Sequence, residues 1–163
     1  MALVRDRRVV DDDWIVLDDD SPVPPGASVI VSLERWRRDH AGLAATDARL
    51  GVRLSGDDDV ADIADALDRL DLVALIFPAF TDGRAYSMAR LLRDRHGYRG
   101  ELRAIGNVLR DQASLMARCG FDAFELPPRT SVEDWLAALS EISVRYQPAA
   151  DRQRAATELR HVR

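Results

Sequence analysis

Lysine is absent from this chain, because all 23 Lys and Arg residues are arginines. Enzymes that form a lysine Schiff base, attach pyridoxal phosphate or hold a nucleotide with a Walker lysine are therefore excluded for this chain. Cysteine occurs once, as Cys119. The chain cannot form an internal disulfide or supply a site built from several cysteines, and we interpret Cys119 as a core residue.

Long apolar segments are also missing. No apolar run reaches the length of about 18 residues that a transmembrane helix needs, and the first residues lack the apolar core of a signal peptide. Together with the single cysteine, this predicts a cytoplasmic protein that does not enter the membrane. The formal net charge of -5 argues against a nucleic-acid binder, which normally carries a basic face.

The length of 163 residues and the hydrophobic content of 47% predict one domain of ordinary size. We assign residues 1–148 to a single α/β domain and residues 149–163 to a charged C-terminal tail. Within the domain, residues 1–26 are expected to form a hairpin and loop extension. Its strand pair is predicted at residues 9–10 and 14–17, which three aspartates separate.

From Ser28 onward the pattern alternates between strand and helix. The expected strands cover residues 29–33, 51–54, 72–77, 101–105 and 122–126, and the expected helices cover residues 34–40, 57–70, 84–96, 108–119 and a segment from Ser131. Five βα units with right-handed crossovers predict a mainly parallel sheet with flanking helices. A flavodoxin-like open sheet is the favoured architecture, and a partial barrel, alone or completed in a dimer, is the alternative.

Polar residues follow two of the expected strands where each strand ends. Thr81, Asp82, Gly83 and Arg84 follow residues 72–77, and Gly106, Asn107, Arg110 and Asp111 follow residues 101–105. Carboxyl ends of parallel strands and helix N-termini meet at one edge of a sheet, so these groups are suited to bind a small oxyanion there. Asp82 and Asp111 are the candidate acid–base groups. Thr81, Asp82 and Asn107 can equally be helix caps.

Three arginines stand at unusual positions. Arg84 and Arg110 lie early in expected helices, where a positive side chain opposes the helix dipole, so that an anion or a neighbouring aspartate would resolve the conflict. Arg103 lies in the middle of an expected strand, on one face with Glu101. It belongs either to a buried ion pair or to a ligand-binding face.

Motifs for metals and cofactors are not found. The three histidines are scattered without a partner four residues away, and the glycines at 97 and 100 precede a strand, unlike those of a dinucleotide-binding fingerprint. We therefore expect neither a metal nor a cofactor.

Three segments together resemble the bacterial domain-of-unknown-function family 934: FPAFTDGRAYSMARLLR from Phe77, GYRGELRAIGNVLRDQ from Gly97 and RCGFDAFEL from Arg118. Members are often labelled oxidoreductases, and their genes commonly neighbour those of sulfite or nitrite reductase. The resemblance implies a role in sulfur assimilation, with one of these reductases or another sulfur-assimilation enzyme as partner. It also implies an acidic residue where this chain has Asn107, and this departure favours binding over acid–base catalysis.

Three functional hypotheses follow. The first is an accessory protein of assimilatory sulfite or sulfate reduction that binds a small oxyanion or docks on the sulfite reductase system. The second is a small enzyme acting on a phosphorylated or sulfated metabolite, with Asp82 or Asp111 as its acid–base group. The third is a structural partner subunit without catalysis, for example as a homodimer.

Overall fold

The computed structural model of the chain describes residues 2–142, 146–150 and 156, so most of the expected tail at residues 149–163 lies outside the described residues. The strands are β1 (Ala2–Arg5), β2 (Arg8–Val10), β3 (Trp14–Val16), β4 (Ser28–Ser32), β5 (Arg49–Leu54), β6 (Leu72–Phe77), β7 (Glu101–Gly106) and β8 (Ala123–Leu126). The helices are α1 (Leu33–Ala44), η1 (Val60–Arg69), α2 (Arg84–Arg90), η2 (Leu91–Arg95), η3 (Arg110–Gln112), α3 (Ala113–Cys119) and α4 (Val132–Ser140). Of these, η1 and η3 are 3-10 helices and η2 is a π-helix.

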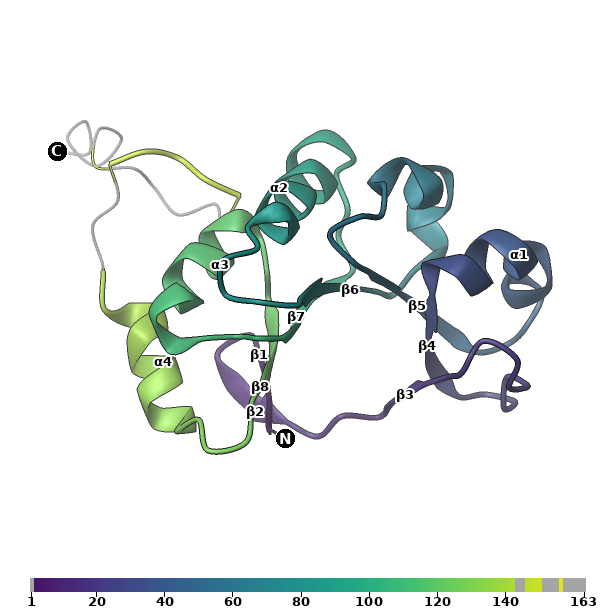
Figure 1. Cartoon of the computed structure of the whole chain (residues 1–163), viewed down its shortest axis with the longest axis horizontal. Helices are drawn as coiled ribbons and strands as arrows, with labels where there is room; N and C mark the ends of the chain where they lie inside the picture. The colour runs from purple at the N-terminus through teal and green to yellow at the C-terminus, as the bar shows by residue number, and fades with distance from the viewer. Residues whose placement is uncertain (1, 143–145, 151–155, 157–163) are drawn as a thin grey trace, which may run out of the picture.

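All eight strands form one sheet, in the order β2-β1-β8-β7-β6-β5-β4-β3. Strands β3 to β8 are parallel, and β1 is antiparallel to both of its neighbours. The sheet curls into a half-barrel, and the helices cover its convex side (Figure 1). The expected α/β class and the five βα units from β4 to α4 are confirmed.

The strand order decides between the two expected architectures. In a flavodoxin-like sheet the order reverses once, which places helices on both faces. Here each new strand from β3 to β8 is added on the same side of the preceding one. Right-handed crossovers then put every connecting helix on one face, and the twisted sheet closes around the other. The flavodoxin-like order was therefore wrong, and the partial barrel is confirmed.

The N-terminal segment does not form the expected strand pair. Strand β2 pairs with β1, which joins β8 at one edge of the sheet, whereas β3 pairs with β4 at the opposite edge. Residues 11–13, which we call the strap, connect the two edges across the open side of the half-barrel (Figure 1). An extended chain spans at most about 3.6 Å per residue, so the strap holds the ends of β2 and β3 within about 14 Å of each other.

The strands bury apolar side chains on both faces. On the convex side, residues such as Val52, Leu75 and Trp135 pack between sheet and helices in the larger core. On the concave side, Trp14 packs with Ile30, Leu72 and Ala74 in a second, smaller cluster. Its position at the end of the strap lets one indole fill part of the hollow that the curled sheet encloses.

Local signals explain several element boundaries. Helix α4 begins as expected, because the Ser131 hydroxyl accepts a hydrogen bond from the Asp134 backbone N–H at 3.2 Å. The expected helix at residues 57–70 is the 3-10 helix η1, and Asp59 caps it by accepting from the Ala61 backbone N–H at 2.9 Å. Cys119 is buried in the core, as expected.

Candidate functional site

A row of alternating arginines and small residues crosses the concave face. The strand register aligns, from β4 to β1, Ser32, Arg53, Ala74, Arg103, Ala123 and Arg5. Side chains alternate between faces along a strand, so all six lie on the concave face. We call this set the arginine row. The small residues give the arginine side chains room to lie across the curved sheet.

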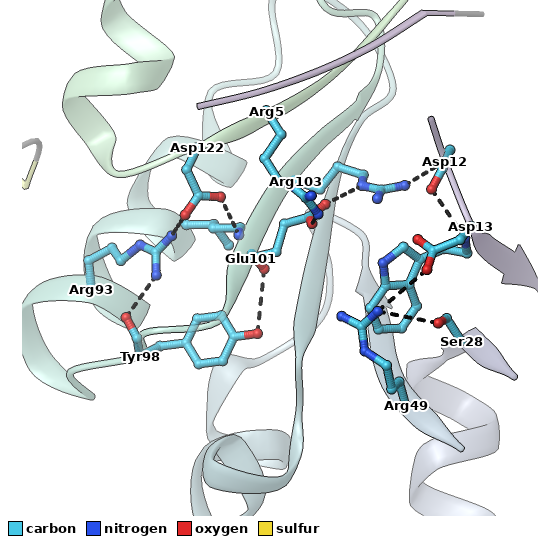
Figure 2. Close-up of polar contacts among 12 residues, drawn as sticks. Arg5, Asp12, Asp13, Ser28, Arg49, Arg93, Tyr98, Glu101, Arg103 and Asp122 are labelled. Carbon is cyan, nitrogen blue, oxygen red and sulfur yellow. Dashed lines mark hydrogen bonds and ion pairs between the residues drawn. The ribbon is translucent and has the colours of Figure 1, made fainter. Parts of the chain in front are cut away.

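Arg103 is the buried member of the row. Its side chain is 1% exposed, and it donates from Nε to Glu101 at 2.7 Å and from Nη1 to Asp12 of the strap at 2.8 Å (Figure 2). The other carboxylate oxygen of Glu101 accepts from Arg5 at 3.0 Å. Of the two alternatives from the sequence, the buried ion pair is confirmed. Arg103 links the sheet to the strap, although its Nη2 finds no partner among the described residues.

A second arginine holds the other end of the strap. The Arg49 guanidinium lies 4.8 Å from the centre of the Trp14 ring and 3.5 Å from the Asp13 carboxylate. It also donates to the Ser28 hydroxyl at 3.4 Å (Figure 2). Cation–π contact and charge thus fix the strap near the amino end of β5. The carboxyl end of β5, at the other end of the strand, borders a cavity.

Arg53 occupies that carboxyl end and differs from the other arginines of the row. It is half-buried, and its side chain has no hydrogen bond or ion pair within the described part of the chain. It lines a cavity of about 410 Å³, which we call the Arg53 cavity. Other residues around the cavity include Ser32, Glu34, Arg37, Asp58 and Ile76. Ligand sites of barrel proteins gather at this end of the strands, so we take the Arg53 cavity as the candidate site.

Sequence reasoning missed Arg53 although the signal was present. Arg53 stands inside the expected strand at residues 51–54, just as Arg103 stands inside its own strand. An arginine in the middle of a buried parallel strand has to find either a carboxylate or a ligand. The same criterion that singled out Arg103 would have identified Arg53.

The residues expected after β6 form a closed cluster of charges. Arg84 donates from Nε at 3.0 Å and from Nη2 at 2.7 Å to Asp82, and its Nη1 contacts Asp57. The side-chain bonds from Arg84 to Asp82, together with one from the Arg84 backbone N–H, lower the pKa of Asp82 to about 2. The conflict between Arg84 and the start of α2 is therefore resolved internally. Thr81 is exposed in the preceding turn, and Gly83 is the N-cap of α2 without a side-chain bond.

The residues expected after β7 lie in the neighbouring turn. Gly106 has φ +88°, and the Asn107 backbone N–H donates to the Phe77 carbonyl at 2.7 Å. A Cβ at Gly106 would lie 2.6 Å from that carbonyl oxygen, so the position requires glycine. Arg110 donates to the Asp134 carbonyl at 3.2 Å, whereas Asp111 is exposed and has no polar partner among the described residues.

The structure brings only part of the expected site together. The turns after β6 and β7 are joined by a hydrogen bond of 3.1 Å from the Gln112 amide to the Phe80 carbonyl. Arg103 lies apart from these turns, under the strap on the concave face. Asn107 does not cap a helix, since η3 begins after Leu109 without a side-chain cap.

A further polar cluster lies where β7 and β8 begin. Arg93 donates to the Tyr98 carbonyl at 2.8 Å and to the Asp122 carboxylate at 2.6 Å (Figure 2). It also donates to the Gly100 and Gly120 carbonyls at 2.9 Å. Burial raises the pKa of Asp122 to about 6, although the nearby guanidinium acts in the opposite direction. The cluster borders a cavity of about 600 Å³. Because every nitrogen of the Arg93 guanidinium is already bonded, we read this cluster as structural.

The family model described as bacterial protein of unknown function (DUF934) matches residues 51–157. The chain belongs to this family. The matched region begins in β5, so it includes Arg53, Arg103 and the turns after β6 and β7. No curated protein matches the chain.

Two features are absent from the described residues, a membrane-spanning helix and a metal-binding group. None of their helices is long and apolar enough to cross a membrane. Within the same residues, no three His, Cys, Asp or Glu side chains come together as they would around a metal ion. The Arg53 cavity presents charged and hydroxyl side chains to a ligand.

Proposed function

We propose that this protein is an accessory component of assimilatory sulfite and sulfate reduction that binds a small oxyanion in the Arg53 cavity. The observation that carries the proposal is the Arg53 guanidinium, which is half-buried at the carboxyl end of β5 and has no polar partner in the part of the chain that the structure describes. A planar guanidinium binds the oxygens of a sulfur or phosphorus oxyanion or a carboxylate through paired hydrogen bonds. The sulfur setting comes from the resemblance of residues 77–126 to family members.

Binding is favoured over acid–base catalysis by the state of Asp82. A general acid or base works best when its pKa lies near the operating pH. Hydrogen bonds from Arg84 hold the pKa of Asp82 at about 2, so at neutral pH this carboxylate stays ionised and acts as the counter-ion of Arg84. The other candidate, Asp111, lies outside the Arg53 cavity.

Anion binding is tested by calorimetric titration of the full chain with sulfite, sulfate and phosphate. We expect Arg53→Gln to weaken binding at least about tenfold, because a charge-assisted pair contributes about 1.5 to 3 kcal/mol. Arg84→Ala should bind normally, since Arg84 is already neutralised, and Arg95→Gln is the control for loss of one exposed positive charge. Unchanged binding by Arg53→Gln, with loss in Arg84→Ala, would move the site to the turn after β6.

The cellular role is tested separately by gene deletion in the native host. We expect an auxotrophy that sulfide relieves and sulfite does not, because the proposed partner is the sulfite reductase system. Affinity purification of the tagged chain should then recover that reductase. Growth restored by sulfite alone would place the protein before the reductase and contradict the proposed role.

A further inference from the structure

The Arg53 cavity contains two charged side chains that no other described residue pairs with. Four charged side chains line it: Glu34, Arg37, Arg53 and Asp58. Arg37 contacts Asp62 on η1, and Asp58 accepts from the Ser55 backbone N–H at 2.7 Å and from its hydroxyl at 2.9 Å. Neither the Glu34 nor the Arg53 side chain has a hydrogen bond or ion pair within the described residues. One cation and one anion are thus available to a ligand.

This charge pattern restricts the ligand. A bare inorganic oxyanion bound to Arg53 would share the cavity with the Glu34 carboxylate, which repels it. A molecule that carries an ammonium group beside its anionic group would instead find a partner for each charge. The volume of about 410 Å³ lies within the range of small-molecule sites. The space therefore suits a short molecule with both groups.

We propose that the ligand of the Arg53 cavity is a short zwitterion, with its anionic group on Arg53 and its ammonium group facing Glu34. This inference rests on the proposed function, because it takes Arg53 as the anion-binding group. The anionic group can be a carboxylate, a sulfonate or a phosphate ester, since all three match a guanidinium. Glu34 would let the cavity select among anions, because it favours those that also carry an ammonium group.

Matched pairs of small anions separate the contribution of the ammonium group to binding from that of the anionic group. Taurine and ethanesulfonate, β-alanine and propionate, and phosphoethanolamine and ethyl phosphate each share an anionic group and differ by one ammonium. We expect the ammonium-bearing member to bind up to about fivefold tighter, the limit for a solvent-accessible ion pair. The pair with the tightest binding identifies the anionic group. Equal binding within every pair would overturn the zwitterion while leaving anion binding intact, and no binding of any probe would overturn both.

Two variants test whether the preference for ammonium-bearing probes arises in the Arg53 cavity. Glu34 is exposed in the first turn of α1, so Glu34→Gln should fold normally. It should erase the preference for the ammonium-bearing probes and keep the affinity for the plain anions, whereas Arg53→Gln should weaken both members of each pair. Asp68→Asn, which removes an exposed carboxylate outside the cavity, is the matched control and should keep the preference. A preference that survives Glu34→Gln would show that Glu34 serves only the start of α1.

Discussion

Arg53 and Arg103 lie in the same row of the sheet, with only Ala74 between them, yet their surroundings are opposite. Arg103 is 1% exposed and is held by Glu101 and by Asp12 of the strap. Arg53 is half-buried and has no carboxylate partner among the described residues. A buried guanidinium is tolerated only when it is paired, whereas a solvated one is free to meet a ligand. The path of the strap therefore decides which arginine is structural and which is available.

The largest loss of stability is expected from substitution of Arg103, the buried member of the arginine row. Arg103→Met leaves Glu101 buried beside Arg5 alone and frees Asp12 from the sheet. Breaking one side of a buried pair costs about 3 to 5 kcal/mol of the free energy of unfolding. Urea denaturation followed by circular dichroism measures this loss. A loss below about 1 kcal/mol would mean that the pair does not hold the strap.

The next effect concerns the small residue that separates the two arginines. Ala74 is fully buried against Trp14 and Ile30 under the strap. Ala74→Leu should overfill this cluster and lower the free energy of unfolding by about 1 to 3 kcal/mol. Denaturation compared with that of Ala66→Leu, a partly buried position of η1 at the rim of the convex core, measures the difference. Equal losses in both variants would show that the concave face is not tightly packed.

A third arginine, Arg93, pairs with a carboxylate whose contribution to the free energy of unfolding depends on pH. Burial raises the pKa of Asp122, the partner of Arg93, to about 6 from its ordinary value of 3.8. The folded state thus holds this proton more tightly, so the contribution to stability is complete below pH 3.8 and is lost as the pH rises through about 6. With an allowance for the 35% exposure of the side chain, we expect a loss of about 1 to 2 kcal/mol.

The variant Asp122→Asn removes this titration. Its free energy of unfolding should stay flatter than that of the wild type between about pH 4 and pH 7, as measured by urea denaturation across this range. Asp94→Asn, an exposed carboxylate in the same region, should keep the wild-type slope. Parallel slopes for Asp122→Asn and the wild type would mean that Arg93 keeps Asp122 ionised throughout.

From residue 28 onward, local patterns in the sequence predicted the strands and helices, but not the order of the strands in the sheet, and strand β1 was not expected. The apolar run at residues 72–77 and the alternation at residues 101–105 appear as β6 and β7. Whether the next strand is added on the same side depends on tertiary packing, because a right-handed crossover is compatible with either choice. The three-residue strands β2 and β3 have too little pattern of their own to reveal partners at opposite edges.

Local patterns also failed to show which distant residues meet at the candidate site. Arg103 was recognised as unusual from its place within a strand, but its partner Asp12 lies 91 residues earlier, and nothing local connects the two. The turns after β6 and β7 could be located from strand ends. That Asp82 serves as the counter-ion of Arg84 follows only from the side-chain geometry. Arg53 could have been singled out from its place within a strand, as Arg103 was, but its lack of a polar partner among the described residues is a property of the folded chain.

The smallest effect on stability should come from Arg53→Gln. Its difference from Arg103→Met tests whether Arg53 is available to a ligand while Arg103 is structural. Among the described residues Arg53 makes no hydrogen bond or ion pair that the substitution could break, so the free energy of unfolding should change by less than about 0.5 kcal/mol, the range for substitutions that remove no packing or bond. Urea denaturation of Arg53→Gln beside Arg103→Met measures the difference directly. A loss approaching that of Arg103→Met would mean that Arg53 has a hidden structural partner. A negligible loss, combined with weakened anion binding, separates binding from stability within one row of the sheet.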